Sequence, residues 1–361
     1  MHSIIGKEEK AYLECMKEHR DQGVHANIKS PKEGFEYFES EDYLKKYVNS
    51  KPVLLERFTA GGLKGFFGMI NIFLKHMGKM MKTRGQCFVD IQPYLDELET
   101  KGFVQGTSDA LLSSYANDSI WNELTQYSKE KWDIHIGFTE VPEELVFKGK
   151  AVLFKYAIVC YQEMREDKIN KAPELEAGSE VMRVYKELGF GVDDIANWLR
   201  GKYGVKCQSN HPLGGLVNTS PLAAKAGLGW QGHNGLLITP KFGQRQRIAP
   251  IFIQDKIFEF TDNSEHKWIE QFCKNCRKCE KNCPPGAIYS EKKISIENVS
   301  GIEQTRTCID RTKCYPYFNK TLGCSVCVRV CPFSKGETQY NKFKQIYSSK
   351  SKEDYHEISY S

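Results

Sequence analysis

The chain has 361 residues, of which 40% are hydrophobic and 27% charged, and its formal net charge is +5. This composition is ordinary for a soluble globular protein, and the length predicts two or three domains with a sizeable core. The small net charge gives no case for nucleic-acid binding by itself. No uninterrupted apolar run in the sequence reaches the length of a membrane span.

The N-terminal region, residues 1–130, is expected to be mostly helical and shows no site motif. Its beginning is mixed and charged, so the pattern predicts no export signal. Residues 61–84 combine apolar side chains with five cations and no acid. Basic amphipathic segments can lie in a membrane interface, but we favour a core or lid helix with a solvated basic side. Residues 85–130 suggest an α/β segment, with a helix that ends in a turn at Gly102.

The middle of the chain alternates between strand and helix patterns. Residues 151–164, AVLFKYAIVCYQEM, are rich in β-branched and apolar residues and predict a buried strand. Apolar residues then recur at three- and four-residue steps over 181–199, which predicts a helix that Gly189 and Gly191 break or kink. A short strand is expected around 203–207.

Residues 212–243 are dense in glycine, which lets the backbone approach a flat or bulky ligand and adopt positive φ. Glycine-rich loops can also hold phosphate, but neither a dinucleotide fingerprint nor a Walker lysine pattern is present here. On composition alone, a ligand-binding loop and a set of turns between short strands are equally good interpretations.

Two cysteine runs near the C-terminus carry the strongest chemical signal. The first has the spacing C-x2-C-x2-C-x3-C-P and comprises Cys273, Cys276, Cys279 and Cys283. The second has the spacing C-x2-C-x3-C-P and comprises Cys324, Cys327 and Cys331, with Cys308 and Cys314 upstream. This pattern is typical of two [4Fe-4S] clusters, in which the cysteine before proline binds the cluster of the other loop. The chain is therefore expected to carry single electrons at low potential.

Zinc and disulfides explain these cysteines less well. A structural zinc site does not require the Cys-Pro ends of both runs. Thirteen cysteines in a chain without an export signal point to a reducing compartment and to metal ligation. The iron–sulfur module is expected over residues 256–338, and a weakly ordered polar tail over 339–361.

The sequence before and within this module resembles one known superfamily. Residues 226–252, AGLGWQGHNGLLITPKFGQRQRIAPIF, followed by a double cluster, are similar to the corrinoid-dependent reductases, which include the reductive dehalogenases and the epoxyqueuosine reductases. Residues 313–335, KCYPYFNKTLGCSVCVRVCPFSK, and the stretch 157–206 are closer to the dehalogenase branch. The resemblance covers roughly residues 134–335. It implies an α+β fold class, with a nitroreductase-like α/β corrinoid-binding core over 131–255 followed by a bacterial-ferredoxin-like two-cluster module.

In this superfamily the glycine-rich region holds cobalamin base-off, largely through backbone contacts and with no histidine ligand to cobalt. The resemblance implies that this loop lies beside the corrin or its tail, through Gly227, Gly229, Trp230, Gly232 and Gly235. It further implies that His233 and Asn234 hydrogen-bond the corrin amides.

The cluster ligands follow from the spacing together with the resemblance. One cubane is assigned to Cys273, Cys276, Cys279 and Cys331. The other is assigned to Cys283, Cys324, Cys327 and one upstream cysteine. We prefer Cys314, because KCYPYF is similar to a CYxYW-type element of the family, and Cys308 in RTCID is the alternative. Three further cysteines are expected to be thiols rather than ligands: Cys15, Cys87 and Cys160.

Reductive cleavage also needs a proton for the product, and members of the family use a tyrosine backed by a cation. Tyr185 in VMRVYKEL and Arg247 in FGQRQRI stand at the corresponding places, with Arg245 as the fallback. Tyr185 also lies on the apolar stripe of its helix, so a packing role is an equal alternative. His211, in SNHPLGG, is expected either to line the substrate pocket or to be structural.

We therefore expect a cytoplasmic reductase that depends on cobalamin and two [4Fe-4S] clusters and cleaves a carbon–halogen or carbon–oxygen bond in a small organic substrate. Reduced ferredoxin or flavodoxin is the expected electron donor. One alternative is an iron–sulfur electron-transfer protein that reduces a separate corrinoid protein. The other is an epoxyqueuosine reductase-like tRNA-modifying enzyme, although Asn218 replaces the aspartate of the family's D-x-x-P element and the phosphate contacts needed for RNA have little support.

Overall fold

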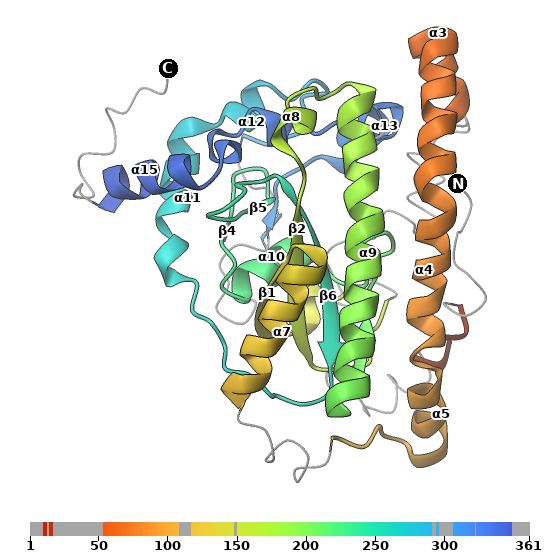
Figure 1. Ribbon diagram of the computed structural model, residues 1–361. Coiled ribbons are helices and arrows are strands. Elements are labelled where there is room, and N and C mark those ends of the chain that lie inside the picture. Colours follow the sequence, from red (N-terminus) through yellow and green to blue (C-terminus); the bar gives the residue numbers. More distant parts are fainter. Residues whose placement is uncertain are drawn as a thin grey trace.

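The structure is a computed structural model that describes residues 10–12, 14–16, 53–107, 117–147, 150–290, 294–295, 306–321 and 323–348. Figure 1 shows a core of sheet and helices, a long helical rod beside it, and a group of short helices above the core. Most of residues 1–50 and the last residues of the expected tail lie outside the described ranges.

The core is built on a four-stranded antiparallel sheet with the order β1-β2-β6-β3. Its strands are β1 (Ile134–Glu140), β2 (Tyr156–Glu163), β3 (Cys207–Ser209) and β6 (Gln246–Ile253). β2 is the predicted buried strand, although it begins at Tyr156 rather than at residue 151. The strand expected around 203–207 forms at 207–209 instead, because Tyr203 still belongs to the preceding helix.

Helices cover both faces of the sheet. One face, with Ile158 and Ile251, packs against α9 (Leu175–Tyr203) and α7 (Asn117–Trp132) (Figure 1). The other face, with Val159 and Phe252, packs against α10 (Thr219–Lys225) and α5 (Gln92–Lys101). Successive residues of β2 therefore enter two different cores, which explains why the strand reads as a continuous apolar run rather than as an alternating one.

Helix α9 continues through Gly189 and Gly191 without the predicted break. That prediction was wrong because these glycines serve close packing rather than bending. A Cβ on Gly189 would lie 2.1 Å from Nε2 of His211, and a Cβ on Gly191 would lie 2.3 Å from Cδ1 of Ile134. The missing side chains let the helix lie directly on β1 and on the segment that follows β3.

A helical rod stands beside α9 (Figure 1). It consists of the part of α3 (Val53–Ile72) that follows a kink at Gly62, where φ is 57°, then the π-helical turn Phe73–Met77 and α4 (Gly78–Val89). The rod packs through Met69 and Ile72 against Leu175 and Met182 of α9. Residues 61–84 thus form the covering helix that we favoured. Within the described ranges, no helix combines the length and the apolar content needed to cross a bilayer.

The segment over 85–130, expected to be α/β, contains helices and a short irregular stretch over 102–107 in its described parts, and no strand there. It contains the end of α4, then α5 and α7. α5 covers QPYLDELETK and ends at Gly102, whose φ of 77° closes the helix as predicted.

The glycine-dense segment folds as short elements between tight turns. After α10, strands β4 (Trp230–Gln231) and β5 (Leu237–Ile238) form a hairpin whose turn contains Gly235 at a φ of 76°. The interpretation as turns between short strands therefore describes the backbone of this segment correctly.

Two further short helices, η2 (Glu143–Leu145) and α8 (Glu166–Ile169), lie in the connections that follow β1 and β2.

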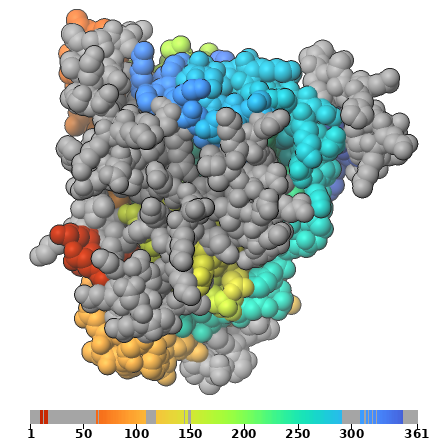
Figure 2. Space-filling model, turned by 180° about the vertical axis from the view of Figure 1, so that it is seen from behind, coloured from red at the N-terminus to blue at the C-terminus, as the bar shows by residue number. Residues whose placement is uncertain are grey.

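Short helices at the top of Figure 1 carry the cysteine runs. In chain order the elements are η3 (Ser264–His266), α11 (Trp268–Cys276), α12 (Lys278–Lys281), the paired strands β7 (Ile294–Ser295) and β8 (Arg306–Thr307), α13 (Arg311–Thr321), α14 (Val326–Arg329), η4 (Pro332–Lys335) and α15 (Glu337–Ser348). Figure 2 shows from behind that the cyan and blue residues of this part gather at the upper end of the molecule.

Helix α15 occupies residues 337–348, where a weakly ordered polar tail was expected from residue 339. That expectation was wrong for these residues because aromatic side chains anchor the helix. Tyr340 and Tyr347 are buried, and their rings lie 5.3 Å and 5.6 Å from those of Trp268 and Phe272 on α11. The packed module therefore extends at least to residue 348.

Candidate functional site

The first cysteine run lies on α11 and α12. Cys273 and Cys276 belong to α11, Cys279 belongs to α12, and Arg277 separates the two helices with a left-handed φ of 49°. Cys331 joins this group from the far end of the module. The pKa of the Cys331 thiol is raised well above its usual value. The main cause is burial, and the neighbouring charges of Cys273, Cys279 and Cys276 add to it. The structure thus brings together the four cysteines of the first predicted ligand set.

The second set repeats this local geometry. Ser325, at a left-handed φ of 59°, lies between Cys324 and α14, which carries Cys327. Burial, followed by the charges of Cys324, Cys314 and Cys283, raises the pKa of the Cys327 thiol to about 12. Thiols from three separate segments therefore meet here, as the predicted second set requires.

The two upstream cysteines lie in different places. Cys314 is on α13, and burial, followed by the charges of Cys283 and Cys324, raises the pKa of its thiol to about 12. Cys308 is buried beside the hairpin turn, where its Sγ lies 3.3 Å from the position of a Cβ on Gly235. The geometry favours Cys314 as the ligand.

The two thiol groups adjoin each other. After burial, the charges that raise the pKa of the Cys279 thiol come from Cys273, from Cys327 of the second group, and from Cys276. Within the described part of the chain, no three His, Cys, Asp or Glu side chains are as close as the ligands of one metal ion.

Tyr185 and Arg247 lie together between α9 and the sheet. Arg247 is on β6 opposite Gln162 of β2, and its Cζ lies 4.9 Å from the centroid of the Tyr185 ring. Both side chains are half-buried. Nε of Arg247 is buried without a hydrogen-bond partner among the described residues. The pair therefore combines a phenol, a stacked cation and a donor without a partner among the described residues.

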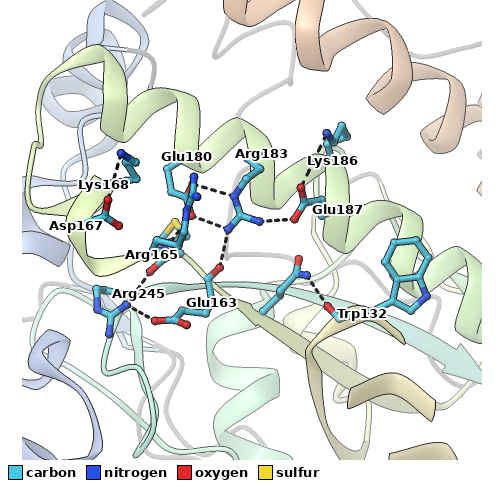
Figure 3. Close-up of polar contacts among 12 residues, drawn as sticks. Trp132, Glu163, Arg165, Asp167, Lys168, Glu180, Arg183, Lys186, Glu187 and Arg245 are labelled. Atoms are coloured by element: carbon cyan, nitrogen blue, oxygen red, sulfur yellow. Dashed lines mark hydrogen bonds and ion pairs between the residues drawn. The ribbon is translucent and has the colours of Figure 1, made fainter. Parts of the chain in front are cut away.

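Arg245, the fallback, has a different role. Its buried guanidinium donates to Oε1 of Glu163 at 2.6 Å, to the carbonyl of Met164 at 2.8 Å and to the carbonyl of Ser334 at 2.6 Å. Figure 3 shows its pairing with Glu163 beside the network of Glu180 and Arg183. Arg245 therefore ties the core to the segment that follows Cys331 and is not oriented towards Tyr185 as Arg247 is.

The glycines of the predicted corrin loop face protein. Cβ atoms on Gly227, Gly229 and Gly232 would lie 2.5 Å from Thr261, 2.0 Å from the carbonyl of Ile238 and 2.8 Å from Gln244. At Gly227 and Gly229, positive φ values of 74° and 152° add to this requirement. Close packing within the chain therefore accounts for these three glycines.

Trp230 is buried on the same hairpin. It belongs to a core cluster that also contains Phe272, Cys276 and Cys331, so it joins the glycine-rich loop to the first cysteine group. Its Nε1 is buried and has no hydrogen-bond partner among the described residues. This indole N–H is a second donor left open beside the cysteines.

His233 and Asn234 contact the cysteine module and their own loop. Nε2 of His233 lies 3.1 Å from Oε2 of Glu280 on α12. Asn234 exchanges two amide hydrogen bonds with Gln244, at 3.0 Å and 2.8 Å, and a hydrogen bond from Asn234 lowers the pKa of Cys327 against the larger effect of burial. The structure thus uses both residues, predicted as partners of corrin amides, within the chain.

His211 is fully enclosed, and its role was left open by the sequence. The backbone N–H of Leu213 donates to Nδ1 at 3.0 Å, which places the ring proton on Nε2. Burial, followed by the charge of Arg84, lowers its pKa to about 3, so the ring is neutral. Nε2 abuts Gly189 of α9 and is buried without a hydrogen-bond partner among the described residues.

Sequence reasoning missed Glu280 and Gln244, the two side chains that connect the glycine-rich loop to its surroundings. Glu280 contacts His233 from 47 positions away and also accepts from Arg277 at 2.6 Å. Neither residue lies in a recognisable motif, so no local signal marks it.

Comparison with known proteins identifies the class of the C-terminal part. Residues 272–334 match the family model described as a 4Fe-4S double cluster binding domain. This part of the chain is therefore a double-cluster ferredoxin-like module.

Relatives extend the similarity into the core. The tetrachloroethene reductive dehalogenase of Desulfitobacterium hafniense is 32% identical over 202 residues, which cover 53% of this chain and 34% of that protein. The epoxyqueuosine reductase of Listeria monocytogenes is 27% identical over 221 residues, which cover 57% of this chain and 56% of that protein. The chain thus spans about a third of the dehalogenase and about half of the epoxyqueuosine reductase.

A solved structure supports the fold. A catabolic reductive dehalogenase in complex with 3-bromo-4-hydroxybenzoic acid superposes with a TM-score of 0.50 and 21% identity, over 59% of this chain and 32% of that one. The predicted resemblance to the superfamily of reductive dehalogenases and epoxyqueuosine reductases, nearer to the dehalogenases, is confirmed. The α+β fold class, with its two-cluster module, is confirmed as well.

Proposed function

We propose that this chain is a cobalamin- and [4Fe-4S]-dependent reductase that cleaves a polarised carbon–halogen or carbon–oxygen bond in a small organic substrate. The observation that carries the proposal is the stacking of Arg247 on Tyr185 within a core joined to a double-cluster module. The reductive dehalogenase relatives support the type of reaction, although they share only part of their length with this chain.

The residues present fit two cubanes. Cys273, Cys276, Cys279 and Cys331 form one group of neighbouring thiols, and Cys283, Cys314, Cys324 and Cys327 form the other. Burial raises the pKa of Cys331 and of Cys327, so their thiols are neutral without metal, and a cluster would deprotonate them when it binds. We assign one cluster to each group.

For cobalamin, the fit rests on open donors. The N–H groups of Trp230 (Nε1) and Arg247 (Nε) are buried without partners in the described structure, and a corrin is rich in amide acceptors. We propose that the loop 226–235 lies beside the ring, with Trp230 as its main side-chain contact. When bound, the clusters supply single electrons at low potential and the corrinoid supplies a strongly reducing cobalt centre.

Tyr185 is proposed to donate a proton to the product from its hydroxyl. The guanidinium of Arg247 stabilises the phenolate that remains, because an opposite charge beside an acid favours its ionised form. General acid catalysis of this kind contributes about 10²–10⁴-fold to a rate.

The test uses protein reconstituted anaerobically with iron, sulfide and cobalamin, a titanium(III) reductant, and 3-bromo-4-hydroxybenzoic acid or tetrachloroethene as probe. Released halide is measured. We expect Tyr185→Phe to lose about 10²–10⁴-fold in turnover with unchanged iron and cobalt content, whereas Tyr156→Phe, a half-buried tyrosine on β2, retains turnover. Equal turnover in Tyr185→Phe and the unmodified protein would remove Tyr185 from the mechanism.

A second candidate function is supported by a separate observation. The glycines of the hairpin face protein atoms, and His233 and Asn234 are used internally. This arrangement favours an electron-transfer protein that reduces a separate corrinoid protein. Cobalamin retained through gel filtration with a base-off absorption spectrum supports the first proposal, and its complete loss supports the second.

Three further assignments remain proposals. We propose a cytoplasmic location and a reduced ferredoxin or flavodoxin as electron donor. We propose that the module begins at residue 256 and that the core, predicted over 131–255, also includes α5 and α7 of the N-terminal region 1–130, because these helices pack on its sheet. The tRNA-modifying alternative is tested by binding of unmodified tRNA at physiological salt, and we expect none.

A further inference from the structure

The helical rod has an inner side and an outer side of different character. Its inner side is buried, with Met69, Ile72, Met80 and Cys87 enclosed against α9 and its neighbours. This side accounts for the covering role of the rod. Figure 1 shows the rod at the edge of the molecule, with its far side away from the other labelled elements.

The outer side carries exposed apolar side chains. Leu63, Phe67 and Leu74 are 64%, 62% and 82% exposed, and they are half of the large hydrophobic residues that the described structure leaves exposed. Their spacings of four and seven residues place them along one stripe. A stripe of this kind is costly to leave in water, and its concentration on one helix indicates that something covers it.

The charge of the rod identifies the partner. Between Arg57 and Val89 the sequence contains Lys64, Lys75, Lys79 and Lys82 and no aspartate or glutamate, and its one arginine, Arg84, is buried. Lys75, Lys79 and Lys82 are exposed on the described rod, next to Leu74. A surface that combines cations with apolar side chains matches anionic lipid headgroups above acyl chains.

We propose that the outer side of the rod binds the surface of an anionic bilayer, with Leu63, Phe67 and Leu74 entering the headgroup region and the lysines pairing with lipid charges. The helix lies along the membrane and does not cross it. This inference is independent of the proposed reaction, because it requires no cofactor and no substrate.

The test is vesicle flotation with the full chain after cluster reconstitution. Vesicles of phosphatidylcholine alone are compared with vesicles that also contain phosphatidylglycerol, at low and high salt. We expect binding to the anionic vesicles, weakened by salt. The variant Phe67→Ser/Leu74→Ser should bind at least about tenfold more weakly, and each lysine changed to glutamine should weaken binding about fivefold.

The matched control is Phe103→Ser, which removes an exposed phenylalanine, 54% exposed, from outside the rod. It should bind anionic vesicles like the unmodified protein, and circular dichroism and iron content should be unchanged in all variants. The proposal is overturned if anionic vesicles do not bind the protein, or if Phe67→Ser/Leu74→Ser binds as well as Phe103→Ser. It is also overturned if gel filtration shows a dimer that Phe67→Ser/Leu74→Ser dissociates, because a second copy would then cover the stripe.

Discussion

Cζ of Arg247, on strand β6, lies 4.9 Å from the ring centroid of Tyr185, on helix α9. The sequence suggested both residues, and the fold places them in contact between helix and sheet. A stacked guanidinium is attracted to the ring and also favours the phenolate. The proposed role of the pair therefore depends on the cation as well as on the phenol.

Replacing Arg247 by methionine should lower turnover about 100-fold while leaving cluster content unchanged, because the bulk remains and the charge is lost. The turnover of Arg247→Lys should lie between those of Arg247→Met and the unmodified protein, since lysine keeps the charge but not the planar stack. Halide release and iron analysis check this, with Lys241→Met, an exposed cation in the same segment, as control. Turnover in Arg247→Met equal to that of the control would refute the role.

Cys314→Ser should lose about half of the iron and sulfide, because one of the two clusters loses a ligand. Cys308→Ser should retain both clusters, since Cys308 lies beside Gly235 and Cys314 lies with Cys283, Cys324 and Cys327. Iron and sulfide analysis with electron paramagnetic resonance distinguishes the two variants. The reverse pattern would transfer the ligand role to Cys308.

Asn234→Leu should make the potential of one cluster more negative by about 20–60 mV. Asn234 hydrogen-bonds the Cys327 sulfur, and such a bond, with a net contribution of about 0.5–1.5 kcal/mol, stabilises the more negative reduced state. A redox titration, monitored by the electron paramagnetic resonance signal of the reduced cluster, measures the shift in potential. His233→Gln, on the same turn but facing Glu280, is the control and should leave the potential unchanged.

Gly189→Ala should destabilise the protein by about 1–3 kcal/mol, because its Cβ would lie 2.1 Å from Nε2 of His211. Gly201→Ala, in the same helix, meets nothing within 4 Å and should stabilise the protein by about 0.5–1 kcal/mol. Urea unfolding of the reconstituted protein compares them. A stabilised Gly189→Ala variant would show that His211 moves away without cost.

Asp193 should give the stability an unusual pH dependence. Burial, followed by the charge of Asp90, raises its pKa from 3.8 to about 6. Because the folded state holds this proton more tightly than the unfolded state, the stability linked to it is present below pH 3.8 and is lost as the pH rises to about 6. Relative to Asp193→Asn, the free energy of unfolding of the unmodified protein should fall by up to about 2 kcal/mol over this pH range, with solvent screening taken into account.

Asp194, the next residue, should give the stability the opposite pH dependence. Burial alone would raise its pKa, but hydrogen bonds from Trp132, Lys131 and Tyr127 outweigh burial and lower it. Its contribution should therefore be present at neutral pH and be lost as the pH falls below the ordinary value for aspartate. The urea midpoint of the unmodified protein minus that of Asp193→Asn should fall as the pH rises from 3.8 to about 6, whereas the same difference for Asp194→Asn should fall as the pH drops below 3.8. Differences that do not change with pH would contradict both assignments.

The sequence by itself determined the double-cluster module and the strand β2. Most ligands of each cluster follow one another within a short loop, so their spacing can be recognised in the sequence alone. A strand that is buried on both faces can be recognised in the sequence as a continuous apolar run. The end of α5 at Gly102 was equally local, because a left-handed glycine closes a helix wherever the chain needs one.

Only the tertiary structure decided which distant groups meet. It placed Cys314 with Cys283 and Cys324, and it turned Arg247 towards Tyr185 while Arg245 pairs with Glu163. It also kept α9 straight through Gly189 by packing His211 there, and it anchored α15 through Tyr340 and Tyr347. These outcomes depend on contacts between residues far apart in sequence, and local pattern and propensity hold no information about which of several nearby candidates such a contact will select.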